Sequence, residues 1–197
     1  MFLRFQQAFS VFPVVSLADI RLHFPGFDSR NLVNWQKKGY LIRLRNGFYR
    51  FSDHQVSEYH LYQVANRMYN PSYISLETAL SYHGVIPEGV VDVQSVGTRK
   101  TARFRNKLGR FSYRTIKPSL YFGYCLLQQD EQAAVRMAYL EKAILDFLYL
   151  RADVDDYAAF EALRWNRTEL ERIDRDKLQA YAGLFRSATL FRKLKWL

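Results

Sequence analysis

Residues 30–50 decide how the first part of the chain folds, and they read RNLVNWQKKGYLIRLRNGFYR. Apolar side chains recur at helical spacing up to Gly39, a residue type on which helices commonly end in a left-handed conformation. From Tyr40 the period changes to two, and the run turns at Asn46-Gly47. Asn-Gly between alternating runs is a strong hairpin signal, because both central residues of a type I′ turn need a positive φ. The stretch predicts a helix over 30–38 and then a β-hairpin.

Two further helices are expected before this stretch, over 4–10 and 17–23. Ser16 can cap the second helix, and Pro25-Gly26 then makes a tight turn. Two helices joined by a tight turn that contains glycine are typical of a helix-turn-helix. Together with the basic hairpin, they predict that residues 1–52 form a winged helix-turn-helix DNA-binding domain.

The rest of the chain mixes strand and helix signals. Runs that alternate or are rich in aromatic residues predict strands over 90–96, 111–116 and 121–127. Caps and apolar periodicity predict helices over 58–69, 76–83, 138–150, 157–163, 174–185 and 189–197. We therefore expect an α+β protein, in which the winged helix-turn-helix precedes a mixed α/β domain, residues 53–197, that ends in helices.

The net charge of +10 is concentrated in two blocks. Residues 1–51 contain eight basic and two acidic residues, and residues 99–117 contain eight basic residues and no acidic one. Residues 52–98, with five acids and one base, separate them. Blocks of one sign indicate surfaces that face a polyanion, since charge that serves only solubility would alternate in sign. The alternative is chance clustering on solvated faces.

Composition excludes other classes of protein. Because 49% of the residues are hydrophobic and 16% aromatic, the chain can fold around a core, unlike a disordered segment. The most apolar stretch, 138–150, is interrupted by charges and is too short for a membrane span. A single cysteine, Cys125, and an N-terminus without an uninterrupted apolar run predict a cytoplasmic protein that makes no membrane contact.

No catalytic, cofactor or metal site is predicted. The sequence has no Gly-rich phosphate loop and no Gly-x-Ser-x-Gly, and its four histidines have no metal-ligand spacing with one another or with Cys125. Asp92 followed by Lys100 loosely matches a nuclease site, but the Glu-x-Lys pair of such a site is missing. We expect Asp92 at a turn or strand edge, in a protein that is not an enzyme and takes no small-molecule substrate.

The helix predicted over 30–38 has a polar face suited to DNA. Arginine pairs with guanine and asparagine with adenine in the major groove, whereas lysine neutralises phosphate. Basic residues of the hairpin would lie against the DNA backbone. The predicted DNA-binding residues are Ser29, Arg30, Asn31, Asn34, Lys37, Lys38, Arg43, Arg45, Asn46 and Arg50. The alternatives are an ordinary solvated helix face and a basic edge hairpin protected against aggregation.

The second basic block is predicted to contact either nucleic acid or a protein partner. Its predicted site residues are Arg99, Lys100, Arg103, Arg105 and Lys107, and Arg110, Arg114 and Lys117 follow them. Phe104, Phe111 and Tyr113 are interleaved with these charges, as in a platform for single-stranded nucleic acid. Such aromatic residues also commonly form the core of a strand.

Three segments of the chain carry a family resemblance. They are LVNWQKKGYLIRLRNGFYR (32–50), YISLETALSYHGVIPE (73–88) and EKAILD (141–146). In this order they resemble the abortive-infection type IV antitoxin family, the AbiEi-like transcriptional regulators. The resemblance implies that the winged helix binds double-stranded operator DNA and represses its own operon. It also implies that the C-terminal part counteracts a nucleotidyltransferase-like toxin from the neighbouring gene, in phage defence. A stand-alone transcriptional regulator and a winged-helix-guided nuclease are the open alternatives.

Overall fold

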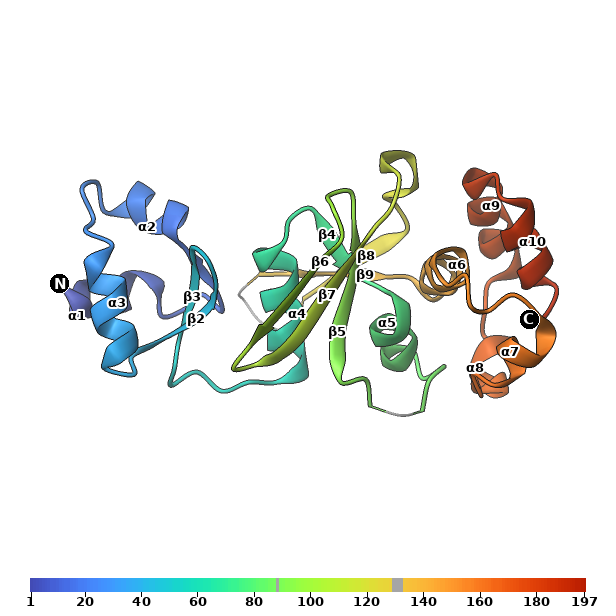
Figure 1. Ribbon diagram of the computed structural model, residues 1–197, viewed down its shortest axis with the longest axis horizontal. Helices are drawn as coiled ribbons and strands as arrows, with labels where there is room; N and C mark the ends of the chain where they lie inside the picture. The colour runs from blue at the N-terminus through green and yellow to red at the C-terminus, as the bar shows by residue number, and fades with distance from the viewer. Residues whose placement is uncertain (88, 129–132) are drawn as a thin grey trace.

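The computed structural model describes residues 1–87, 89–128 and 133–197, and it has a mixed α+β fold. Figure 1 shows three parts in a row: helices and a small sheet from the N-terminus, a larger sheet in the middle, and helices from the C-terminus at the far end. No helix in the described part of the chain has the length and apolar character needed to cross a membrane.

Residues 1–52, called the N-terminal unit below, contain three helices and a three-stranded antiparallel sheet of order β1-β3-β2. The elements are α1 (Phe2–Phe9), β1 (Val15–Ser16), α2 (Leu17–His23), α3 (Arg30–Lys37), β2 (Leu41–Arg45) and β3 (Phe48–Phe51). All three helices lie where the sequence predicts them, with ends shifted by at most two residues.

The local sequence explains where these helices begin and how they pack. The Ser16 hydroxyl accepts a hydrogen bond from the N–H of Asp19 (3.1 Å), and the Asp19 carboxylate accepts one from the N–H of Ser16 (2.9 Å). This reciprocal capping satisfies two backbone donors at the start of α2. Phe5, Ile20 and Leu32, from the three helices, are almost completely buried in one cluster. The unit therefore has a hydrophobic core of its own.

The hairpin turns at Asn46-Gly47, as predicted, but the predicted type I′ turn is wrong. Gly47 has a φ of +78°, whereas Asn46 does not have a positive φ. The register shifts between Arg43 and Arg45, so that Leu44 forms a bulge. A bulge supplies the extra twist that a type I′ turn would otherwise provide. The bulge also matters for packing, because Leu44 is buried in the core of the C-terminal region.

The C-terminal region is built on a six-stranded mixed sheet of order β6-β7-β5-β4-β9-β8, in which β5 and β7, and β4 and β9, pair in parallel. The strands are β4 (Ser72–Ile74), β5 (Asp92–Gly97), β6 (Ala102–Asn106), β7 (Gly109–Thr115), β8 (Tyr124–Leu127) and β9 (Val135–Ala138). Strands β5, β7 and β8 confirm predicted runs, whereas β4, β6 and β9 were not predicted.

Helices cover the two faces of this sheet unequally (Figure 1). On one face, the Tyr113 hydroxyl of β7 donates to the Ala65 carbonyl of α4 (Glu58–Met68; 2.9 Å). On the other, the Thr78 hydroxyl of α5 (Leu76–Tyr82) donates to the Asp92 carbonyl (3.0 Å), and α6 (Leu140–Leu150) packs beside α5. A 3₁₀ turn, Pro118–Leu120, precedes β8. The remaining helices are α7 (Tyr157–Glu161), α8 (Arg167–Glu171), α9 (Arg175–Phe185) and α10 (Ala188–Leu194).

Side-chain hydrogen bonds hold the N-terminal unit against the C-terminal region at α2 and at the hairpin. Arg67 of α4 donates two 2.8 Å hydrogen bonds to the carboxylate of Asp19 on α2. At the hairpin, the Asn106 side-chain amide of β6 donates to the carbonyl of Leu44 (3.2 Å). Because Leu44 also contributes its side chain to the C-terminal core, the hairpin is held against the edge of the larger sheet.

A buried polar cluster links α6 to β4. Lys142 and Asp146 are one helical turn apart, have no exposed side-chain surface, and form an ion pair. Asp146 also accepts hydrogen bonds from the hydroxyls of Tyr73 (2.8 Å) and Ser75 (2.9 Å), and Lys142 donates to the Tyr73 hydroxyl (2.7 Å). Burial raises the pKa of Asp146 and lowers that of Lys142, while their mutual attraction opposes both shifts. These contacts give the segment 141–146 a structural role inside the fold.

Candidate nucleic-acid interface

The helix α3 buries Leu32 and Trp35 and exposes its charged side chains, as the sequence predicts, although Val33 is also 51% exposed. Leu32 and Trp35 are buried in the core of the N-terminal unit, at 1% and 6% exposure. Arg30, Asn34 and Lys37 are exposed, and so is Lys38, which follows the helix. The outer face of α3 therefore presents a guanidinium, an amide and two ammonium groups to solvent.

Arg30 is engaged by a local partner at the start of this helix. Its guanidinium lies 2.6 Å from the Asp28 carboxylate, although the Arg30 side chain is still 87% exposed. Hydrogen bonds from the backbone N–H and the side chain of Arg30 lower the pKa of Asp28. Water and salt screen an exposed pair of this kind, so it contributes little to stability. Arg30 can therefore exchange Asp28 for another partner at little cost.

Asp28, rather than Ser29, stabilises the first turn of α3. Its carboxylate accepts the backbone N–H of Arg30 (2.9 Å), and its carbonyl accepts the side-chain amide of Asn31 (3.1 Å). Ser29 occupies the N-cap position but makes no side-chain capping bond. The Ser29 hydroxyl is exposed, so it remains available at the solvent end of the helix.

The hairpin residues that were predicted to contact DNA differ in accessibility. Arg43 and Asn46 are exposed and bonded to each other, since the Arg43 guanidinium donates to the Asn46 side-chain oxygen (3.2 Å). Arg45 is half-buried, and its guanidinium lies 4.8 Å from the ring centre of Phe48 and 5.0 Å from that of Phe104. Arg43 and Asn46 remain accessible, whereas Arg45 packs between the N-terminal unit and the larger sheet.

The prediction that Arg50 contacts DNA is wrong, because this side chain is only 3% exposed. Its guanidinium donates to the backbone carbonyls of Phe51 (3.2 Å), His54 (2.8 Å) and Gln55 (3.4 Å). β3 is the central strand of its sheet, and the segment that follows it folds back over Arg50. Arg50 therefore fixes the connection between the N-terminal unit and α4 from the inside.

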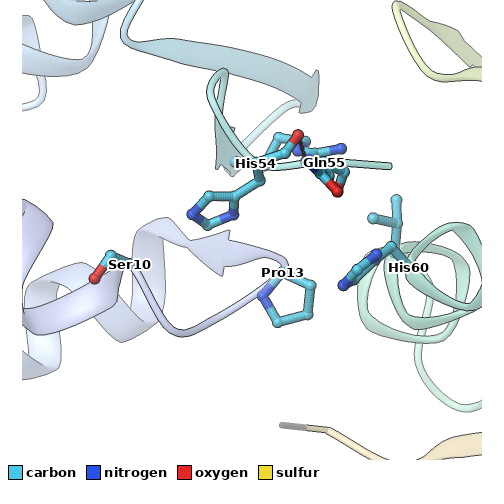
Figure 2. Close-up of a pocket in the computed structure, with 7 residues that line it drawn as sticks. Ser10, Pro13, His54, Gln55 and His60 are labelled. Carbon is cyan, nitrogen blue, oxygen red and sulfur yellow. Dashed lines mark hydrogen bonds between the residues drawn. The ribbon is translucent and has the colours of Figure 1, made fainter. Parts of the chain in front are cut away.

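A cavity of about 200 Å³ lies beside this connection. Figure 2 shows Pro13, His54 and His60 around it, and Arg50 also contributes to its lining. Burial lowers the pKa of His54, and Arg50 adds to this effect by repelling a second positive charge. The cavity belongs to the junction between the N-terminal unit and α4, and it is separate from the exposed face of α3.

The pairing of β6, β7 and β5 sorts the second basic block onto two faces. Arg103 and Arg105 are exposed on alternate positions of β6. Arg105 lies opposite Arg110 of β7, and Arg103 lies opposite Ser112. Directly paired residues share a sheet face, so Arg103, Arg105, Arg110 and, two residues further along β7, Arg114 lie together. These four residues are called the basic sheet face below.

The aromatic residues interleaved with these charges lie on the opposite face. Phe104 pairs with Phe111, and Phe111 and Tyr113 are each 1% exposed, on the face that α4 covers. Tyr69, the residue that follows α4, packs on both Phe104 and Tyr113. Of the two alternatives left open for these aromatic residues, the structure therefore supports strand core rather than a platform for single-stranded nucleic acid, since the rings are stacked inside the protein.

The other predicted residues of the second block separate from the basic sheet face. Arg99 turns towards α4, where its guanidinium donates to the Asn70 carbonyl (3.3 Å) and lies 4.7 Å from the ring centre of Tyr69. Lys100 is exposed in the β5–β6 connection, and Lys107 is exposed in the turn after β6. The structure instead adds Arg151, which follows α6 and lines the same groove as Arg103, Arg110 and Arg114. Sequence spacing gave no signal for this residue.

Asp92, the candidate nuclease residue, begins β5 and pairs with Arg110 at 2.5 Å. Within residues 1–87, 89–128 and 133–197, no three His, Cys, Asp or Glu side chains converge in a way that would hold a metal ion. The arrangement around Asp92 is thus a charge pair at the border of the basic sheet face.

Neither the models of known protein families nor the curated protein sequences match this chain. The resemblance to AbiEi-like regulators therefore stays a prediction that rests on its three segments. In the structure these segments form α3 with the hairpin, β4 with α5, and the first part of α6. Glu88, the last residue of the second segment, lies outside the described residues.

Proposed function

We propose that this chain is a sequence-specific DNA-binding transcriptional regulator, and that its N-terminal unit acts as a winged helix-turn-helix. One observation carries the proposal: α3 buries Leu32 and Trp35 and presents Arg30, Asn34 and Lys37 on its open face. The order of α2, a tight turn, α3 and a basic hairpin supports the same assignment.

In this proposal α3 enters the major groove, which is wide enough to admit a helix. Asn34 pairs with an adenine edge, and Arg30 leaves Asp28 to pair with a guanine edge. Lys37 and Lys38 neutralise phosphates, and Arg43 of the hairpin does the same beside the groove. Phosphate contacts position the protein and supply salt-dependent affinity, whereas base contacts supply specificity.

The experiment compares duplex DNA from upstream of the protein's own gene with a scrambled duplex of equal length. Arg30→Ala or Asn34→Ala should weaken binding to the upstream duplex by about 1–3 kcal/mol and weaken binding to the scrambled duplex much less. Gln7→Ala, an exposed change on α1, is the matched control and should leave both affinities unchanged. An equal loss on both duplexes for Asn34→Ala would contradict base recognition by α3.

The family resemblance adds a second candidate role, as an autoregulating antitoxin of a type IV toxin–antitoxin operon. One observation favours a second function beside DNA binding: the basic sheet face lies on strands of the C-terminal region, outside the N-terminal unit. Co-expression with the product of the neighbouring gene tests this role: an antitoxin restores growth even when Asn34→Ala has weakened operator binding. Absence of rescue favours a stand-alone regulator. Metal-dependent DNA cleavage that Asp92→Ala abolishes would favour the nuclease instead.

A further inference from the structure

The basic sheet face lies beside a groove of about 510 Å³, on the same side of the sheet as α5 and α6. The α5 residues Leu76 and Glu77 line one side of it, and Leu150 and Arg151 at the end of α6 line another. The lining also includes side chains of β5, β6 and β7. The groove is therefore formed by the fold itself: the ends of two helices border it, and three strands form its floor.

The groove carries more positive than negative charge. Arg110 is paired with Asp92, and Arg151 is paired with Glu77 at 2.7 Å. In the parts of the chain that the structure describes, Arg103, Arg105 and Arg114 have no carboxylate partner, and Arg114 donates only to the Leu150 carbonyl (3.0 Å). Arg103 and Arg114 inside the groove, and Arg105 beside it on the same face of β6, can thus bind an external anion.

Polar side chains at the bottom of the groove also have unused hydrogen-bonding capacity. Among the described residues, neither the amide of Gln94 nor the hydroxyl of Ser112 has a hydrogen-bond partner, and both line the groove. Gln94 and Ser112 lie opposite each other on β5 and β7. A ligand in the groove would therefore meet hydrogen-bond donors and acceptors on the floor and guanidinium groups along the side.

The chemistry of the groove favours a carboxylate-bearing protein segment over nucleic acid. The described residues offer no exposed aromatic ring on this face on which a base could stack, because Phe104 and Phe111 lie on the opposite face and Tyr113, although it borders the groove, is only 1% exposed. Asp92 and Glu77 also line the groove, and their charges would act on a carboxylate as they would on a phosphate. The N–H groups of a peptide backbone can donate to these two carboxylates, whereas the backbone of single-stranded DNA has no donor for them.

We propose that this groove binds an acidic, extended segment of a partner protein. Arg103 and Arg105 are two residues apart on β6, so their side chains rise about 7 Å apart, which is also the spacing of alternate side chains in an extended peptide. Each guanidinium can bind one carboxylate through a bidentate pair of hydrogen bonds.

The partner's acidic residues are therefore expected at alternate positions. This assignment goes beyond DNA binding and uses none of the side chains on α3. Its failure and the failure of the proposed DNA-binding function can thus be told apart.

The test measures fluorescence anisotropy of a labelled peptide of alternating glutamate and serine with the full chain at low salt. Its comparison ligands are a peptide of the same composition with the glutamates in one block, and a single-stranded oligothymidylate of equal charge. Arg103→Gln/Arg105→Gln removes two exposed charges, and Arg4→Gln/Arg21→Gln removes two exposed charges from the N-terminal unit as a charge-matched control. Ser112→Glu places a carboxylate in the groove.

We expect the alternating peptide to bind more tightly than the block peptide and the oligothymidylate. Arg103→Gln/Arg105→Gln and Ser112→Glu should each weaken it at least tenfold, and the control less than twofold. Equal weakening by the control would show attraction by net charge alone and would overturn the proposal. Tighter binding of the oligothymidylate that is lost in Arg103→Gln/Arg105→Gln would also overturn it, in favour of a nucleic-acid surface. Absence of peptide binding overturns it too.

Discussion

The guanidinium of Arg45 lies 5.0 Å from the ring centre of Phe104, so a side chain of the N-terminal hairpin is stacked on the edge strand of the C-terminal sheet. The rings of Phe48 and Tyr69 lie on the same guanidinium, at 4.8 and 5.8 Å. A basic residue that the sequence assigns to DNA contact is thereby used for packing between the two parts of the chain.

Arg45→Ala should lower the free energy of unfolding by about 1–2 kcal/mol, because a cation shared among partly buried rings is worth more than an exposed one. Arg43→Ala, on the same strand but exposed, is the control and should change stability by less than about 0.5 kcal/mol. Urea unfolding of both variants gives the comparison. Equal stabilities would mean that Arg45 contributes nothing to the junction.

Arg43 and Arg50 should differ in what they do to DNA binding. Arg43→Gln should make the slope of log K against log salt shallower by about one, as expected for one lost phosphate contact. Arg50→Met should instead lower the free energy of unfolding by about 1–3 kcal/mol, since it leaves buried carbonyls without a donor. The folded Arg50→Met protein should keep the salt slope of the parent chain, and a reduced slope would restore Arg50 to the DNA surface.

Breaking the buried ion pair of α6 should be more damaging than removing it. Lys142→Met leaves Asp146 buried without its cation and should cost about 3–5 kcal/mol of unfolding free energy. The double change Lys142→Met/Asp146→Leu should recover part of this loss, because no uncompensated charge remains. Thermal or urea unfolding of the three proteins measures the difference, and a double variant less stable than Lys142→Met would contradict this account.

Stability should decrease as the pH falls from 7 towards 5. Burial lowers the pKa of His83 below its ordinary value of 6.5, and its ring is bonded to the Ala138 carbonyl at 2.9 Å. In the unfolded chain this histidine takes up a proton near pH 6.5, whereas the folded protein resists protonation, so acid favours unfolding. His83→Gln should flatten the dependence of unfolding free energy on pH in this window. An unchanged dependence would assign the effect to other groups, of which His54 is the first to examine.

The sequence predicted the helices well because their signals are local. Ser16 caps α2 and Gly39 follows α3 with a φ of +75°, and both features are visible in the sequence. Strand β6 was missed because its residues, Ala102–Asn106, read as a basic block, and its apolar partners come from β7 and α4. Long-range pairing, rather than local propensity, makes this segment a strand.

The candidate site was predictable where exposure follows from helical periodicity, as on α3. It was not predictable for Arg50, whose burial depends on β1 pairing with β3 and on the connection that folds back over it. The approach of Arg151 to Arg114 was not predictable either. Arg151 follows a helix and Arg114 lies on a strand, and only the tertiary fold brings these two elements together.

The alternation of side chains along β6 has a consequence for how this gene can change. The side chains of Arg103 and Arg105 face only solvent and the groove. Substitutions at these positions can therefore give the protein new partners without loss of its fold. Deleting a single codon between Ala102 and Asn106 would shift the strand by one residue, send arginines against α4 and turn Phe104 towards water. We therefore expect substitutions to accumulate in this strand during evolution while insertions and deletions are eliminated.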